Sequence, residues 1–174
     1  SGAGGVTGTL PIANGGTGAT TLAGAGLDNT PYYFVSLSAN QTVSSGSWNK
    51  VNANTEIYDS AGAYDNSSNY RFTPAGYYYF SATVGGKSST ASSHYGTGVR
   101  ISLNGSTSIA ENYYLGHTTN DIQESDVATS ALQYMNGSSD YIELWGYCQV
   151  NAGTPYIIGG TERGTHILGY KIIG

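Results

Sequence analysis

The stretch Gly76–Val84, GYYYFSATV, decides the fold because its alternation is that of a half-buried β-strand. Successive side chains of a strand point to opposite faces, so every second residue lies on the same face. The apolar face of this strand holds Tyr78, Phe80, Ala82 and Val84. Just before it, Pro74 fixes the backbone φ angle and Gly76 permits a close backbone approach, which predicts a turn that leads into the strand.

The rest of the chain has the composition of an all-β protein. Leu, Ile, Val and Phe make up only 31 of the 174 residues, and 16 Tyr residues supply further apolar area. Tyr, Thr and Val favour strands, whereas Gly and Asn favour turns. The net charge is -5 and the six Lys and Arg residues are scattered, which argues against nucleic acid as a partner. No apolar stretch approaches the length of a membrane span, so we expect no membrane insertion.

Period-two alternation predicts eight to ten short strands and essentially no helix. They are expected at 32–38, 56–59, 69–73, 76–84, 98–104, 106–116, 127–135, 140–150 and 166–173. Asn104 and Gly105, between two of these strands, are a strong hairpin signal. A β-sandwich of jelly-roll type fits this pattern best.

The first 30 residues differ from the remainder. They are rich in Gly and hold no aromatic residue, whereas aromatic residues are frequent from Tyr32 onward. We place a boundary near Pro31, which gives a Gly-rich neck segment at 1–30 and a globular head at 31–174.

Strand directions predict a head with two unlike ends. Successive antiparallel strands reverse direction, so alternate connections lie at the same end. The tight connections at 104–105 and 136–139 share one end with the close of the last strand, and the long connections at 85–97, 116–125 and 151–165 share the other. Long loops on a rigid scaffold commonly carry recognition, although tolerated insertions would give the same pattern. The candidate receptor-binding residues are His94, Tyr95, His117, Asn120, Asp121, Glu124, Tyr156, Glu162 and Arg163.

Large aromatic residues also occupy positions that a solvated sheet face would leave polar. Tyr77 and Tyr79 lie opposite the apolar face of their strand, and Trp145 and Tyr147 lie opposite the apolar positions of 140–150. Either a second layer of the same chain or a neighbouring subunit would cover such residues. We therefore expect oligomerisation, with these four as candidate interface residues.

Two parts of the chain resemble known families. LPIANGGTGATTLAGAGL, residues 10–27, resembles the Gly-rich motif of bacteriophage tail fibres, which stands ahead of a C-terminal head. Residues 40–82 resemble the core signature of globular heads in the complement subcomponent-q and tumour necrosis factor superfamily: Tyr64-Asp65, then Tyr70, then FTPAGYYYF at 72–80. This copy has one residue fewer between Pro and Gly than is usual. The segments 136–147 and 164–173 are similar to later strands, so the resemblance covers roughly 32–174.

This resemblance implies a ten-stranded jelly roll that assembles as a homotrimer, with both termini on the stalk side and the long loops at the far tip. It carries over no catalytic residues. Some members of the superfamily hold calcium near the trimer axis, and no matching ligand motif is legible here. We expect no cofactor, and the sequence leaves open a structural calcium or other ion near the trimer axis.

Arrangements that could carry catalysis or hold a metal are weak. A glycosidase needs two carboxylates across the scissile bond. Asp121, Glu124 and Asp126 come nearest, and we interpret them as ordinary acidic residues of a solvated loop. His94, His117 and His166 lack metal-ligand spacing. They could form a ring of His side chains near the tip that binds a metal or responds to pH, or they could be three unrelated exposed residues. The one cysteine, Cys148, is expected to be buried and inert.

Together these patterns predict a non-enzymatic, homotrimeric adhesin at the far end of a phage tail fibre on the virion. Its expected partners are other copies of itself, the upstream fibre shaft, and a bacterial surface glycan or outer-membrane protein. The alternatives are a structural trimerisation cap without receptor contact, a glycan depolymerase, and a secreted cytokine-like ligand. The fibre motif argues against the last of these.

Overall fold

The computed structural model of the chain describes residues 9–12, 16–21, 24–25, 29–65, 70–72, 75–116, 122–160 and 164–172, with backbone alone for 70–72. Within these ranges every regular element but one is a strand, the exception being a single 3₁₀ residue at Ile12. The described residues before Tyr32 include no strand.

The described residues form thirteen strands, and each of the nine expected ranges overlaps a different one of them. In chain order the strands are β1 (Tyr32–Ser36), β2 (Gln41–Thr42), β3 (Ser47–Lys50), β4 (Thr55–Asp59), β5 (Tyr64–Asp65), β6 (Tyr70–Phe72), β7 (Ala75–Ser88), β8 (His94–Leu103), β9 (Thr107–Leu115), β10 (Glu124–Asn136), β11 (Tyr141–Val150), β12 (Pro155–Ile157) and β13 (His166–Lys171). The additional strands β2, β3, β5 and β12 have two to four residues each. So short a strand places at most two residues on a face, too few for alternation to be recognised.

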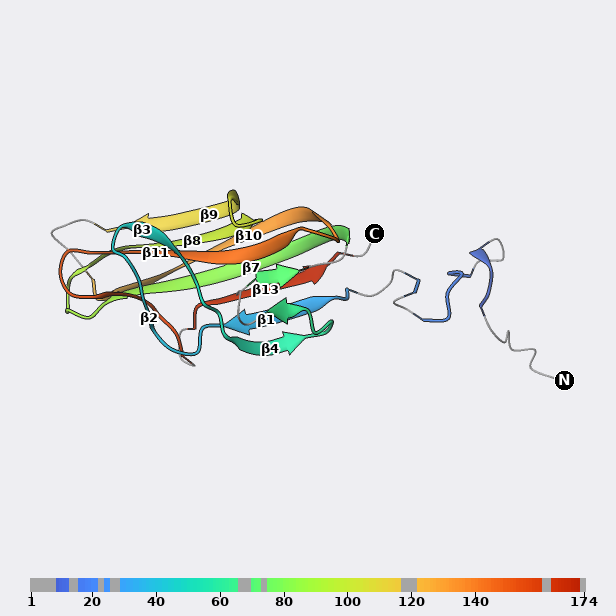
Figure 1. Cartoon of the computed structure of the whole chain (residues 1–174), viewed down its shortest axis with the longest axis horizontal. Helices are drawn as coiled ribbons and strands as arrows, with labels where there is room; N and C mark the ends of the chain where they lie inside the picture. The colour runs from blue at the N-terminus through green and yellow to red at the C-terminus, as the bar shows by residue number, and fades with distance from the viewer. Residues whose placement is uncertain are drawn as a thin grey trace.

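The strands form two antiparallel sheets that pack face to face as a sandwich (Figure 1). Sheet A has the order β2-β12-β7-β13-β1-β4, and β10 pairs with the other edge of β7. Sheet B has the order β5-β6-β11-β8-β9, and β3 also pairs with β11. The predicted all-β jelly-roll sandwich is therefore confirmed.

The stretch that decided the fold lies at the centre of sheet A. β7 pairs with β10 from Ala75 to Lys87, with β13 from Tyr78 to Thr83, and with β12 beyond that point. Its inward residues Tyr78, Phe80, Ala82 and Val84 are all buried, as the alternation predicted.

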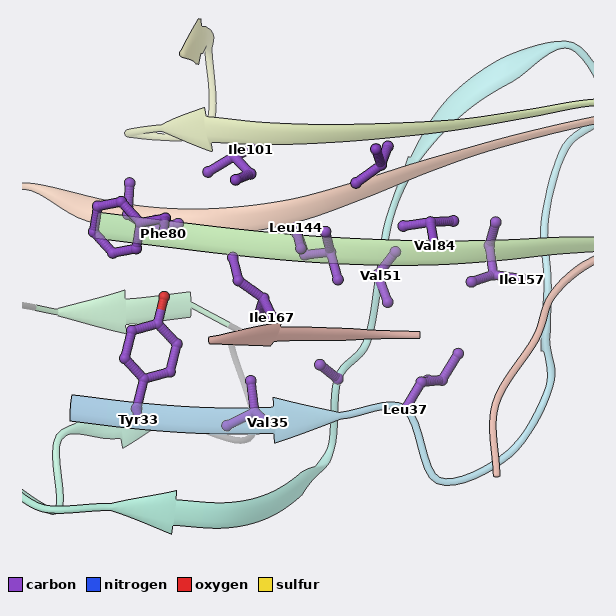
Figure 2. Close-up of a cluster of buried hydrophobic side chains, with 14 of the residues drawn as sticks. Tyr33, Val35, Leu37, Val51, Phe80, Val84, Ile101, Leu144, Ile157 and Ile167 are labelled. Atoms are coloured by element: carbon purple, nitrogen blue, oxygen red, sulfur yellow. The ribbon is translucent and has the colours of Figure 1, made fainter. Parts of the chain in front are cut away.

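The core lies between the two sheets and draws residues from both (Figure 2). Val35 and Phe80 from sheet A are fully buried, as are Val51 and Ile101, which lie in or beside sheet B. Each such side chain contributes roughly 1.5–3 kcal/mol by leaving water. This shared core is what holds the outer faces of the sheets in fixed positions.

Glycine is required where the chain turns into β7 and into β9. Gly76 has φ +142°, a conformation that residues with a Cβ rarely adopt, and its nearest neighbour is the flexible end of the Lys171 side chain and not, as the sequence predicted, another backbone. Asn104 and Gly105 both have positive φ, and the Ser106 N–H donates to the Leu103 carbonyl at 3.3 Å. These are the features of the predicted tight hairpin turn.

The core predicts unequal effects of the same substitution at two isoleucines. Ile101→Ala removes a fully buried side chain and should lower the free energy of unfolding by about 2–5 kcal/mol. Ile57→Ala, at a position that is 44% exposed on β4, should change it by less than about 0.5 kcal/mol. Guanidinium unfolding of both variants at one chain concentration measures this, and equal losses would contradict the assigned core.

Candidate functional site

The connections at one end of the sandwich are joined to one another by backbone hydrogen bonds. The Ser89 N–H donates to the Thr154 carbonyl at 3.0 Å, which joins the β7–β8 connection to the β11–β12 connection. The Gly116 N–H donates to the Tyr95 carbonyl at 2.6 Å, which brings in the connection after β9. We call this the loop end.

The opposite end, the termini end, is where the chain enters β1 and leaves β13 (Figure 1). There the Lys171 N–H donates to the Pro31 carbonyl at 3.0 Å. The tight turns after β8 and β10 lie at the same end. The two unlike ends expected from strand direction are therefore present.

The loop end is built more compactly than the sequence suggested. The first of the three expected long loops, 85–97, is a turn of five residues, 89–93, because β7 continues to Ser88 and β8 already begins at His94. The third, 151–165, is interrupted by β12, which pairs with both β7 and β2. Gly residues in β7 and β8 interrupt the alternation of apolar and polar side chains, so the sequence did not indicate where these two strands end and begin.

His94 is not the exposed loop residue that the sequence predicted. Its side chain is 1% exposed, and its Nε2 lies 2.8 Å from Oγ1 of Thr97 and 2.9 Å from Oγ of Ser125. Its Nδ1 lies 3.8 Å from Sγ of Cys148. His94 therefore ties β8, β10 and β11 together beneath the surface and cannot itself contact a receptor.

Three other predicted receptor-binding residues lie at the loop end. Glu124 and Tyr156 flank Lys87 in register across sheet A, and all three are partly exposed. Tyr95, in the second position of β8, is also partly exposed. The remaining candidates lie outside the described residues: His117, Asn120, Asp121, Glu162 and Arg163.

The outer face of sheet A carries a row of aromatic and apolar side chains near the termini end. Leu132, Tyr79, Tyr170 and Tyr32 follow one another in register across β10, β7, β13 and β1. Tyr77 and Tyr134 continue this surface, with ring centroids 5.3 Å apart. We call these six residues the tyrosine face. Leu132 is 63% exposed and Tyr77 is 59% exposed, so a large apolar surface meets solvent in the single chain.

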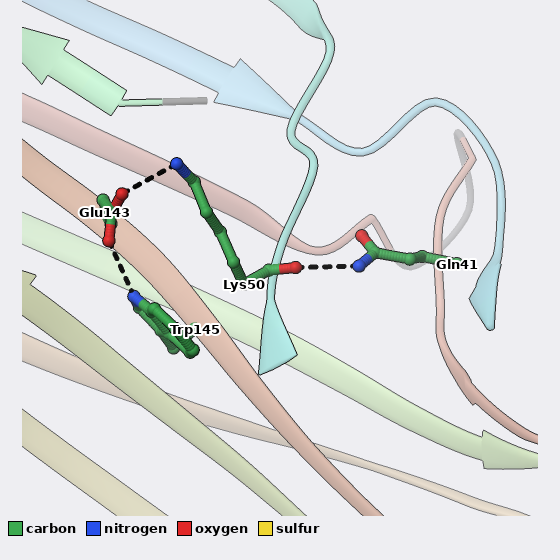
Figure 3. Close-up of polar contacts among 4 residues, drawn as sticks. All are labelled: Gln41, Lys50, Glu143 and Trp145. Atoms are coloured by element: carbon green, nitrogen blue, oxygen red, sulfur yellow. Dashed lines mark hydrogen bonds and ion pairs between the residues drawn. The ribbon is translucent and has the colours of Figure 1, made fainter. Parts of the chain in front are cut away.

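The other two predicted interface residues lie on the opposite side of the molecule. Trp145 and Tyr147 belong to the outer face of sheet B, where β3 pairs alongside them. Glu143, only 7% exposed, accepts hydrogen bonds from Nζ of Lys50 at 2.7 Å and from Nε1 of Trp145 at 3.0 Å (Figure 3). The four residues expected in one interface are therefore divided between the two outer faces, because alternation identifies a face but not which sheet it belongs to.

A groove of about 630 Å³ hollows the outer face of sheet A beyond the tyrosine face. Asp126 and His166 line it together with Phe34, whose ring packs edge-on against His166 at 5.3 Å between centroids. Within the described ranges no group of three or more His, Cys, Asp or Glu side chains could hold a metal ion. His94 and His166 do not share a surface, so these two cannot belong to one ring of exposed histidines.

Cys148 is fully buried, as expected, and its thiol is free. Burial raises the pKa of the thiol to about 11, although contacts with the backbone of Lys87 and Tyr156 offset part of the rise. The thiol is therefore protonated at neutral pH, the form that is a poor nucleophile.

The architecture is that of the jelly-roll domains typified by complement C1q and tumour necrosis factor. The globular domain of zebrafish complement 1qA protein superposes with a TM-score of 0.58 at 13% identity, over 82% of this chain and 98% of that one. Murine APRIL gives a TM-score of 0.56 at 12% identity, over 81% of this chain and 99% of that one. The Eiger TNF of S. frugiperda gives 0.50 at 10% identity, over 82% and 93%.

No protein-family model and no curated protein sequence matches the chain. At such low identities the structural likeness establishes the fold alone. Among the described residues no helix is long and apolar enough to cross a membrane.

The buried thiol predicts slow labelling and a pH-dependent stability. Ellman's reagent should leave Cys148 of the folded chain unmodified at pH 8 and should react fully in guanidinium. Since the pKa is raised above its ordinary 9.0, the thiol's contribution to stability is complete below pH 9 and is lost as pH rises through about 11.

The pH-dependent contribution of the thiol to stability is measured against Cys148→Ala, which has no group that titrates at this position. The difference in unfolding free energy between the wild type and Cys148→Ala should therefore shrink between pH 8 and pH 10.5. A constant difference, or rapid labelling of the folded chain, would contradict the assigned burial.

Proposed function

We propose that this chain is the head of a bacteriophage tail fibre, a homotrimeric adhesin that binds the bacterial surface with its loop end and performs no catalysis. The observation that carries the proposal is the opposition of the two ends. Pro31 and Lys171 are bonded at the termini end, and the joined connections lie at the other. A chain continued upstream of β1 as a shaft would therefore present the loop end outward.

The Gly-rich motif at 10–27 supports placement of the head on a fibre. Small side chains let several chains approach closely, which suits a joint between a shaft and a head. This neck segment would then connect to the sandwich beside the end of β13.

The tyrosine face supports self-association. Aromatic residues bury much area at a low cost in side-chain entropy, and Tyr keeps a hydroxyl for hydrogen bonding at an interface rim. Because the face crosses sheet A near the termini end, three copies could pack around a common axis through it, with their loop ends pointing the same way. Three weak sites held together in this way adsorb far more firmly than one.

Candidate contacts with the host are the partly exposed Tyr95, Glu124 and Tyr156, together with the sequence-predicted His117, Asn120, Asp121, Glu162 and Arg163. Tyr rings can stack on sugars, and the charged and amide groups can hydrogen-bond hydroxyls or a protein loop. The receptor in this proposal is a surface polysaccharide or an outer-membrane protein of the bacterium. The second candidate, a trimerisation cap without receptor contact, rests on the same tyrosine face.

Self-association is tested by a charge placed in the tyrosine face. Leu132→Asp should convert the associated wild-type chain into monomers, because burying an unpaired carboxylate is costly. Ser47→Asp, which adds the same charge at an exposed position of β3 in sheet B, should associate like the wild type. Sedimentation velocity over micromolar concentrations distinguishes these results, and a monomeric wild type would refute the trimer.

Host adhesion is tested at the loop end with association intact. Tyr95→Ala and Tyr156→Ala should each weaken binding of the fluorescent chain to susceptible bacteria by about tenfold, as for residues at the centre of an interface. Thr107→Ala, exposed beside the turn at the termini end, is the control.

Unchanged binding in both loop-end variants would favour the cap over the adhesin. Release of reducing sugars from host polysaccharide by the wild-type chain would instead establish a depolymerase.

A further inference from the structure

A row of aromatic side chains crosses the outer face of sheet B. Trp48 of β3 lies in register with Tyr147 of β11, Tyr147 with Gly98 of β8, and Gly98 with Tyr113 of β9. Cross-strand partners lie on the same face of a sheet, so three rings surround one glycine. Trp48 and Tyr147 pack with ring centroids 5.7 Å apart, and Tyr113 is 56% exposed.

Gly98 lies beneath these rings, beside a groove that is lined by Trp48, Glu111, Tyr113, Leu115 and Tyr147. A Cβ at this position would come within 2.8 Å of Trp48, 3.0 Å of Tyr147 and 3.1 Å of Tyr113. Its φ lies outside the left-handed region, so space and not backbone conformation calls for glycine here. The groove has a volume of about 250 Å³, below the roughly 300–1,000 Å³ of sites for drug-sized ligands.

The next row along the same face supplies polar groups. Nε of Arg100 donates to Oε2 of Glu111 at 2.7 Å, and the guanidinium lies 4.0 Å from the centroid of the Trp48 ring. The two charged side chains remain 26% and 32% exposed. Glu111 lines the groove, and the guanidinium paired with it lies over the Trp48 ring, so the two charges cancel beside the groove.

The rings are held in place before any ligand arrives. The Lys50–Glu143 ion pair fixes the end of β3, and the Lys50 carbonyl accepts a hydrogen bond from Nε2 of Gln41 at 2.8 Å. The hydroxyl of Tyr147 donates to Oε1 of Gln149 at 2.5 Å. Burial raises the pKa of Tyr147, and Cys148, Tyr113 and Tyr95 raise it further, so the phenol is neutral at physiological pH.

We propose that this groove binds one pyranose ring of a neutral glycan, with the C–H face of the sugar stacked on Tyr113 and Trp48 and its hydroxyls bonded to Glu111 and Arg100. Aromatic faces attract the C–H bonds of a sugar, and a carboxylate–guanidinium pair both accepts and donates hydrogen bonds. The paired charges favour a neutral sugar, because an acidic one would meet Glu111 and a basic one would meet Arg100.

This groove lies on the flank of the head, on the sheet opposite the tyrosine face. It therefore goes beyond the proposed loop-end adhesion, and the two can fail separately. Free sugars test the groove alone, whereas whole cells test the loop end. A Tyr113 variant that loses sugar binding but keeps cell binding would separate the two sites.

The experiment titrates the full chain with the methyl glycosides of glucose, galactose, mannose, rhamnose and N-acetylglucosamine. Saturation-transfer NMR and tryptophan fluorescence report binding, since Trp48 lines the groove. At least one glycoside should bind, and Tyr113→Ala should weaken that binding by tenfold or more. The matched control is Tyr114→Ala, the next residue of β9, which is 44% exposed and points to the other face of the strand.

Gly98→Val provides an independent test, because a side chain at this position would push Trp48, Tyr147 and Tyr113 apart without removing a ring. It should abolish sugar binding, with circular dichroism confirming the fold; if it does not fold, Tyr113→Ala and Glu111→Gln decide the matter. The proposal is overturned if none of the five glycosides binds, or if Tyr113→Ala binds as tightly as Tyr114→Ala.

Discussion

The constraint on which the rest of the structure depends is the two-sided pairing of β7. One edge of this 14-residue strand is occupied by β10, and the other is shared by β13 and β12. Its inner face supplies Tyr78 and Phe80 to the core, and its outer face supplies Tyr77 and Tyr79 to the surface. A slip of one residue would exchange these two faces, so the register of one strand sets the character of the whole sheet.

The two outer faces that result have different characters. Sheet A leaves its tyrosines and Leu132 uncovered, a surface that is costly for a monomer and useful for an assembly. Sheet B instead extends its aromatic row onto β3, where Trp48 packs against Tyr147, and the buried Glu143 carboxylate joins Lys50 of β3 to Trp145. Contacts within the chain thus fix the aromatic row of sheet B, whereas the tyrosine face of sheet A meets solvent.

Most of the fold could be predicted from the sequence because long strands repeat their alternation several times. β7 and β11 each bury one face along most of their length, β10 alternates between partly buried and exposed residues, and the turn at Asn104 and Gly105 has a conformation that few residue pairs adopt. The early start of β8 could not be predicted, because Gly96 and Gly98 interrupt the alternation of that strand. The short strands could not be predicted either, because their pairing is decided by neighbours that are distant in the chain.

The candidate sites were harder to predict for the same physical reason. Alternation correctly separated Trp145 and Tyr147 from the core, but it could not place them on a different sheet from Tyr77 and Tyr79. His94 has a polar sequence context, and its burial follows from hydrogen bonds to Thr97 and Ser125, the latter on another strand. The groove beside Gly98 is lined by residues of β3, β9 and β11, which are distant from one another in the chain, so no local sequence pattern indicates it.

The hydrogen bond between the Lys171 N–H and the Pro31 carbonyl holds the start of the first strand and the end of the last strand together at one pole of the sandwich. Whatever is joined ahead of β1 or after β13 therefore meets the sandwich at that pole. A reporter or a foreign shaft could be fused ahead of β1 or after β13 without obstructing the loop end at the opposite pole. In the same way, the sandwich could be moved between carriers as one unit, because neither junction passes through the loop end.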